Sequence, residues 1–584
     1  MITKTNKMLG VVLGILFLGS SCEMNNLPLD SISPNTFFNT EGDLKLYTNS
    51  FYNMLPNAEG VYNERVDNII STDLSDELRG TRIVPTSDGG WLWSDLRNIN
   101  YFLVNSHRCP DNKAVMKYNG VARFFRAYFY FEKVKRFGDV PWYSEPIEPN
   151  DEKGLKKGRD PRTLIMDSIL VDIDYAIANL PAEIRVNEIT KWTALALKSR
   201  ICLFEGTFRK YHTEFNLPNA NRFLDEAISA ADNLMRNGPY VIYNDNTGKA
   251  YQNLFSSMDA IPSEVILARN FDDGLQVYHN LNYYTMTASY GRPGLEKRLV
   301  NSYLMKDGSR FTDIAGYEKM GFYEEIQNRD PRLSQTIRTP GYTRIGETTK
   351  LVQEFGATVT GYQLIKYVTE RKWDTYAKSA NDMPIFRYAE VLLNYAEAKA
   401  ERGTIVQEDI DRSIKHIRDR VNMPNMDVGS ANKHPDPYQA EIYSGVTGNN
   451  KGIILEIRRE RRIELVMESF RWDDIMRWKA GSILTKQFKG MYFPGTGSFD
   501  LDNDGTTDVV IYEGETKPDI KNVQLLKLNG DITLEYGNHG GNILINSHIE
   551  KVFDENKDYL CPIPISERLL NPNLTQNPGW KDGL

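Results

Sequence analysis

Apolar residues recur at the spacing of one helix face along most of this 584-residue chain. In the segment 120–139 they follow the i, i+3, i+4, i+7 pattern of an amphipathic helix. Gly138 stands where the C′ residue that ends this helix is expected. Similar stretches occupy 162–180, 191–208, 221–237, 386–402, 408–421 and 453–480. The spacing therefore predicts a mainly α fold.

Several of these stretches come as pairs with a short break between them, such as 162–180 with 191–208 and 386–402 with 408–421. One face of some of them carries small residues: Ala227, Ala230, Ala231, Ala389, Ala396 and Ala400. Paired helices with such faces indicate stacked hairpins of the tetratricopeptide type, although the sequence has no clean 34-residue period. We expect this helix-pair scaffold mainly at 36–238 and 376–481.

Helical spacing lapses at about 240–375 and again at 482–556, where Tyr, Asn, Gly and Asp accumulate around short apolar bursts. Examples are Val265–Leu267 and Tyr362–Leu364. We interpret both segments as loop-rich insertions with a few short strands, which together form an irregular ligand-binding half. Loops held on a rigid scaffold are where binding residues concentrate.

The N-terminus has the pattern of a secretory signal. Lys4 and Lys7 precede an apolar run from Met8 to Leu18, and small residues lead to Cys22. We predict a lipoprotein signal peptide at 1–21, lipidation of Cys22, and a polar tether over 22–35. Leu18 lies four residues before the cysteine, where three is usual, so ordinary secretion is the alternative.

Composition and motifs exclude several functions. The net charge is −8 with both signs interspersed, which makes nucleic acid an unsuitable partner. With seven histidines, the chain has no H-E-x-x-H, G-x-S-x-G, Walker or G-x-G-x-x-G motif. Paired carboxylates for glycoside hydrolysis could be sought among Glu460, Glu464 and Glu468, but their i, i+4 spacing beside Arg461 and Arg471 favours ion pairs within one helix. We expect no enzymatic activity and no catalytic residue.

One loop has the spacing of a calcium site. Its oxygen donors occupy loop positions 1, 3, 5, 7 and 9: Asp500, Asp502, Asp504, Thr506 and Asp508. Gly505 stands at position 6, but position 12 is Ile511 and not the bidentate Glu of an EF-hand. The alternative is a solvated turn that leads into the strand VVIY. No cofactor is required, and a structural calcium ion is the one metal the sequence suggests.

Five blocks resemble the SusD/RagB family of outer-membrane lipoproteins. They are GVARFFRAYFYFEKVKRFGDVPW (120–142), RDPRL (329–333), MPIFRYAEVLLNYAEAKAERG (383–403), RRERRIELVMESFRWDDIMRW (458–478) and YLCPIPISERLLNPNLTQNPGW (559–580). SYLMKDG (302–308) is similar to that family too. The resemblance runs nearly the length of the chain and implies one SusD-like domain over 36–584, with the last block as a C-terminal motif at 559–580.

The resemblance also implies a role. It suggests a lipid-anchored protein on the surface of the outer membrane that binds oligosaccharides and delivers them to a SusC-like TonB-dependent transporter. A RagB-like member that binds peptides or another nutrient is the alternative. We expect the charges inside the blocks to form fixed ion pairs between stacked helices: Arg123, Arg126, Arg387, Glu390, Glu397, Arg461, Glu464 and Arg471.

Ligand contacts are then expected outside the blocks, where aromatic residues stand among polar residues and glycines. Two segments have this composition, SDGGWLWSD (87–95) and NYYTMTASYGRPG (282–294). The candidate stacking residues are Trp91, Trp93, Tyr283, Tyr284 and Tyr290. Arg292, Asp73 and Arg82 are the candidate partners for sugar hydroxyls. The alternative for each Trp is a core anchor at the start of a helix.

Overall fold

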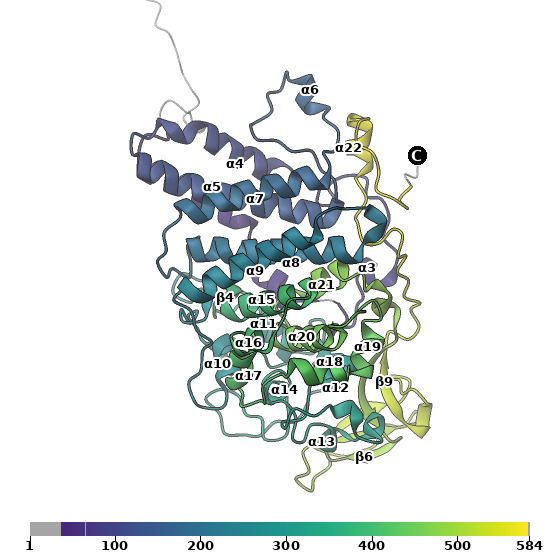
Figure 1. Cartoon of the computed structure of the whole chain (residues 1–584). Coiled ribbons are helices and arrows are strands. Elements are labelled where there is room, and N and C mark those ends of the chain that lie inside the picture. Colours follow the sequence, from purple (N-terminus) through teal and green to yellow (C-terminus); the bar gives the residue numbers. More distant parts are fainter. Residues whose placement is uncertain (1–36, 65, 582–584) are drawn as a thin grey trace, which may run out of the picture.

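Stacked layers of helices form the larger part of the molecule in the computed structural model, which describes residues 37–64 and 66–581. Figure 1 shows three layers, from α4, α5 and α7 through α8 and α9 to α15, α20 and α21. These helices are α4 (Ser94–Asn105), α5 (Asn112–Phe137), α7 (Arg162–Asn179), α8 (Lys191–Tyr211), α9 (Ala220–Asn237), α15 (Tyr388–Arg402), α20 (Lys451–Glu464) and α21 (Arg471–Arg477). The predicted mainly α class is confirmed.

The helices pack as hairpins, mainly α5 on α7 and α8 on α9. The predicted pairing of 162–180 with 191–208 is therefore a contact between neighbouring hairpins and not a hairpin itself. Helix α5 ends as predicted, because Gly138 adopts φ 70° at its C-terminus. Gly206 allows α8 and α9 to approach closely, since a Cβ atom there would lie 2.8 Å from Leu224 Cδ2.

Two stretches predicted as continuous helices are broken. The 408–421 stretch forms α16 (Gln407–Asp411) and α17 (Ile414–Asp419), and the 453–480 stretch forms α20 and α21. Between α20 and α21 the chain turns through Met467 and Ser469, at φ 63° and 60°. This turn directs Glu468 to Arg387, whose Nε donates to Glu468 Oε2 at 2.6 Å. A buried charge, rather than a helix-breaking residue, sets the break.

The irregular half carries short helices and strands. The strands are β1 (Ile69–Ile70), β2 (Val265–Arg269), β3 (Gly294–Leu295), β4 (Met383–Arg387), β5 (Phe488–Phe493), β6 (Gly497–Phe499), β7 (Val509–Tyr512), β8 (Gln524–Lys527) and β9 (Gly541–Ile545). They pair as β1–β3, β2–β4 and β5–β9, all antiparallel, and as β6–β7–β8, in which β7 and β8 are parallel. The expected strands at Val265–Leu267 and VVIY form, whereas Gln363 and Leu364 make only isolated bridges.

Short helices connect these parts of the molecule. They are α1 (Glu41–Asn49), α2 (Ala58–Tyr62), α3 (Asp76–Arg79), α6 (Glu152–Leu155), α10 (Ala250–Ser256), α11 (Leu281–Met286), α12 (Lys297–Ser302), α13 (Phe322–Glu325), α14 (Pro331–Ser334), α18 (Val428–Lys433), α19 (Pro437–Ile442) and α22 (Ile565–Leu570). Within the residues that the structure describes, no helix is both long enough and apolar enough to cross a membrane. The predicted signal peptide, the lipidated Cys22 and the tether lie outside these residues.

Buried ion pairs hold the layers together. Arg387 contacts Glu264, Glu464 and Glu468 at 3.0, 2.8 and 2.6 Å, and all four side chains are nearly inaccessible to solvent. Burial alone raises the pKa of Glu464, but the guanidinium groups around it, including Arg387, hold that pKa well below its usual value. Glu464 is therefore charged and fixed, which makes it a poor general acid.

The partners of these acids differ from the prediction. Glu460, Glu464 and Glu468 bind cations from other segments and not the predicted Arg461 and Arg471 of their own stretch. The other block charges form the expected links between elements: Arg123 and Arg126 with Asp172, Arg200 with Glu390, Arg477 with Glu397, Arg461 with Asp474, and Arg471 with Asp67.

The C-terminal segment returns to the first helical layer. Asn577 Nδ2 donates to the carbonyl oxygen of Phe137 at 3.1 Å, at the end of α5. Arg82 Nη2 forms an ion pair with Asp558 Oδ1 at 2.9 Å, and its guanidinium lies over the ring of Trp580. The last block of the chain thus closes the end of the layer that the first block begins (Figure 1).

Candidate ligand-binding site

Three tyrosine rings form a partly exposed group on loops of the irregular half. Tyr283 lies on α11, Tyr290 lies in the following loop, and Tyr376 lies in the loop before β4. The Tyr283 ring lies 5.9 Å from that of Tyr290 and 5.5 Å from that of Tyr376, between ring centroids. Tyr376 is 64% exposed, and the other two rings are half-buried. We call Tyr283, Tyr290 and Tyr376 the tyrosine platform.

Hydrogen bonds fix the platform to the scaffold. Tyr290 Oη donates to Glu59 Oε1 at 3.0 Å, on α2, and Tyr283 Oη lies 2.8 Å from Ser289 Oγ. Tyr284, a candidate from the sequence, is only 1% exposed. Its Oη donates to Asn63 Oδ1 at 2.9 Å, and its ring packs edge-on against Tyr290. Tyr284 is therefore buried against Tyr290 of the platform and exposes no ring face to solvent.

Two of the predicted polar residues come to the same loop. The amide of Thr72 donates to the carbonyl oxygen of Gly291 at 3.0 Å, which continues the β1–β3 pairing. This places the exposed Asp73 beside the segment that joins Tyr290 to Arg292. Arg292 has φ 49°, and its Nη2 donates to the carbonyl oxygen of Phe355 at 2.7 Å.

The tryptophans lie elsewhere, at the start of α4. Trp91 is 5% exposed, and its ring packs edge-to-face against Trp93 and Phe137, at centroid distances of 5.3 and 4.8 Å. Trp93 precedes the first turn of α4, and its half-buried ring contacts Phe129 and Tyr143 at 5.6 and 5.9 Å. Trp91 thus packs as a core anchor before α4, which is the alternative to a ligand contact given above for each tryptophan.

A cavity of about 630 Å³ adjoins this pair. Its lining includes both tryptophans together with Asn100, Tyr143 and Leu570 of α22. Among the residues that the structure describes, its lining includes none of the platform tyrosines. The predicted aromatic residues therefore lie in two separate places, the tyrosines at the platform and the tryptophans at this cavity.

Arg82 contributes to neither group. Its Nη2 bonds both the side chain and the carbonyl oxygen of Asp558, the latter at 2.7 Å, so it holds the C-terminal segment. No pattern in the sequence indicates this role of Arg82, because its partner Asp558 lies 476 residues away.

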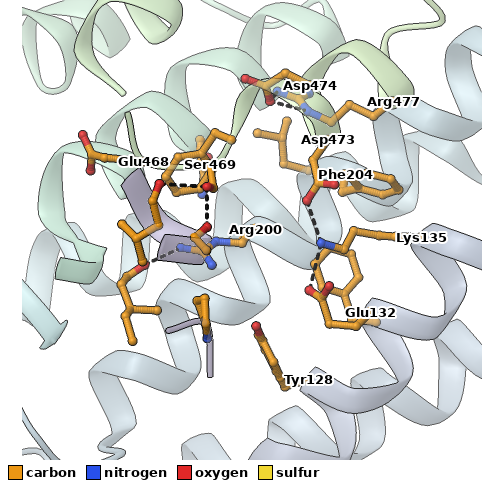
Figure 2. A pocket seen from close by; sticks show the side chains of 18 of the residues that line it. Tyr128, Glu132, Lys135, Arg200, Phe204, Glu468, Ser469, Asp473, Asp474 and Arg477 are labelled. Atoms are coloured by element: carbon orange, nitrogen blue, oxygen red, sulfur yellow. Dashed lines mark hydrogen bonds and ion pairs between the residues drawn. The ribbon is translucent and has the colours of Figure 1, made fainter. Parts of the chain in front are cut away.

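A charged pocket of about 200 Å³ lies between α5, α8 and α21 and is shown in Figure 2. Lys135 Nζ bonds Asp473 Oδ2 at 2.6 Å and Glu132 Oε1 at 2.8 Å, and Arg200 Nε bonds Glu390 Oε1 at 2.6 Å. Burial lowers the pKa of Lys135, but the two acids more than offset this and raise it. The pocket's cations are already paired, so we assign it to the scaffold.

Sequence reasoning missed Tyr376. It stands among charged residues in RKWDTYAKS (371–379), at the end of the stretch regarded as loop-rich. An aromatic residue in so polar a segment was the available signal.

The acidic loop brings three carboxylates together. Oxygen atoms of Asp500, Asp502 and Asp504 lie within 4.8 Å of one another. Burial and the neighbouring acids raise the pKa of Asp502, and similar causes raise that of Asp508. The Asp500 carboxylate also accepts amide hydrogens, from Asn503 at 2.6 Å and Gly505 at 2.8 Å, as in an ordinary Asp-rich turn. Calcium here stays a prediction.

Titration with calcium chloride checks this prediction. Because a cation would relieve repulsion among the acids, we expect saturable binding with a dissociation constant of about 10⁻⁴–10⁻³ M. Asp502→Asn should abolish it, and Asp519→Asn, at an exposed acid outside the loop, should not. Absence of any heat signal, together with an unchanged melting temperature in chelator, would contradict it.

Comparisons with known proteins agree with this architecture. The model of the SusD family matches residues 263–580, and a model described as "Starch-binding associating with outer membrane" matches residues 96–203. The chain belongs to the SusD family. It is 24% identical over 519 residues to "SusD-like protein P2" of Formosa agariphila, covering 82% of this chain and 92% of that protein.

Solved SusD-like structures share the fold. A SusD-like protein from Bacteroides fragilis superposes with a TM-score of 0.68 at 20% identity, covering 95% of this chain and all (100%) of that one. A SusD-like carbohydrate-binding protein from the same species gives 0.67 at 21% identity, covering 92% of this chain and 100% of its own. At these identities the likeness concerns the fold.

Proposed function

We propose that this chain is a surface lipoprotein that captures an oligosaccharide and passes it to a SusC-like TonB-dependent transporter. Membership of the SusD family supports this role, and the tyrosine platform is the observation that carries it. Delivery to a transporter needs residence at the outer membrane, for which lipidation of Cys22 would provide the anchor.

The chemistry of the platform suits a sugar. Sugar rings present C–H faces that pack on aromatic rings, while their hydroxyls need donors and acceptors at the edge. The platform supplies the rings. Asp73, Glu59 and Ser289 lie on or beside the segments that carry them, and they supply polar atoms. Catalysis is not part of the proposal, since the acids of 458–478 are held in ion pairs.

The test is isothermal titration of residues 23–584 against plant, mucin and microbial oligosaccharides, followed by peptides. We expect Tyr376→Ala to weaken glycan binding about tenfold, since a few aromatic residues that a ligand covers carry most of a site's affinity. Tyr536→Ala is the matched control, because Tyr536 is 63% exposed against 64% for Tyr376.

If Tyr376→Ala binds the glycan with the same affinity as the original chain, the tyrosine platform is not the glycan-binding site. Binding of peptides and of no glycan would move the chain to the RagB-like alternative.

A further inference from the structure

A further cavity lies beside the segment that follows Tyr290 of the platform. Its volume is about 310 Å³. Arg292 and Thr72 line it from the paired loop, Thr358 lines it from the segment beside them, and Thr533 and His548 line it from the segments around β9. Hydroxyl, imidazole and guanidinium groups thus converge on one space. We call it the Arg292 cavity.

Arg292 is the cation of this cavity, and it is not committed to an acid. Its Nη2 donates to the carbonyl oxygen of Phe355, and its buried Nε has no hydrogen-bond partner among the residues described. Among the residues that the structure describes, no ion pair includes Arg292, whereas Arg387 and Arg332 both bind acids. Asp531 also lines the cavity, and its Oδ2 accepts the amide hydrogen of Lys527 at 2.7 Å.

The backbone places Arg292 at the edge of the platform. Arg292 follows Gly291. Because φ is 49° at Arg292 and 74° at Gly291, the chain turns sharply after Tyr290. Its amide donates to the Tyr290 carbonyl, and its carbonyl accepts from the Val359 amide, both at 2.9 Å. A left-handed φ is a strained conformation for arginine, and strain of this kind clusters at ligand-binding sites. Two residues span at most about 7 Å, which is near the length of one sugar unit.

From this placement we propose that the site takes an acidic glycan, with a sugar ring on the tyrosine platform and a carboxylate or sulfate group bound by Arg292 in the adjoining cavity. Guanidinium groups bind such planar or multidentate anions through paired hydrogen bonds, and the surrounding threonine hydroxyls can complete the shell. The inference rests on the proposed function and specifies its substrate class.

The experiment compares matched pairs of oligosaccharides by titration. Oligogalacturonates are set against their carboxyl-reduced products, and sulfated galactan oligosaccharides against their desulfated products. In at least one pair we expect the acidic member to bind about tenfold tighter, because a hydrogen bond to a charged group is strong. The pair that responds identifies the anion, and binding of the acidic member should weaken as salt is raised.

Variants assign the preference to one residue. Arg292→Gln should erase the acidic preference, and Arg292→Lys should keep part of it, since lysine retains the charge without the paired donors. Arg236→Gln is the control, because Arg236 is exposed and pairs with Asp232 on its own helix.

Two results would overturn the inference. If both members of every pair bind equally and Arg292→Gln changes nothing, the acidic class is wrong, while sensitivity to Tyr376→Ala would keep the platform. If no saccharide of either kind binds, the proposed function falls with it.

Discussion

Replacing Arg387 with methionine is expected to destabilise the protein by about 3–5 kcal/mol, since it removes a cation that three buried carboxylates share. Arg387 is 1% exposed and bonds Glu264, which precedes β2, and Glu464 and Glu468, at the end of α20 and in the turn after it. Methionine fills a similar volume, so the loss would report charge and not a void. The measurement is urea denaturation followed by circular dichroism.

The control for Arg387→Met is Arg236→Met. That arginine also has an acidic partner, but its side chain is 63% exposed, so its loss should cost less than about 1 kcal/mol. Equal denaturation curves for Arg387→Met and the original chain would refute the assignment of these blocks to the scaffold.

Replacing Trp91 with alanine is expected to lower the free energy of unfolding by about 3–5 kcal/mol, the usual cost of a large void in a core. The ring is 5% exposed and packs against Trp93 and Phe137. Thermal melting monitored by near-ultraviolet circular dichroism would measure the loss.

Trp91→Phe is the companion variant and should lose less, since it keeps a ring against Phe137. At a temperature where Trp91→Ala is still folded, its glycan affinity should equal that of the original chain. A folded Trp91→Ala protein of normal stability that has lost glycan binding would show that Trp91 is a ligand residue after all.

The fold was largely predictable because its signals are local. Helix α5 shows its apolar spacing and its terminal Gly138 within one segment, and the strand VVIY follows its turn directly. The break between α20 and α21 was not predictable, since RRERRIELVMESFRW keeps helical spacing and has neither Gly nor Pro. The partners that set this break, such as Arg387 and Lys366, lie about a hundred residues away in sequence, at separations of 81 and 102.

The candidate site was predictable only in its residue types. Tyr283 and Tyr290 are close in sequence, and they are close in space. Whether an aromatic residue faces solvent or the core depends on distant segments: Phe137 covers Trp91, and Asn63 holds Tyr284 inward. The sequence shows neither contact, so the two kinds of tyrosine and the two tryptophans could not be separated from it.

The return of the C-terminal segment to α5 bears on how the chain reaches its folded state. The bond from Asn577 to Phe137 spans 440 residues, and that from Arg82 to Asp558 spans 476. Contacts of such range form late, because the closure entropy of the whole intervening loop must first be lost. The end of α5 therefore stays uncovered until the C-terminal segment has folded back onto it. A chain that ends before Asp558 leaves this part of the first helical layer open to solvent.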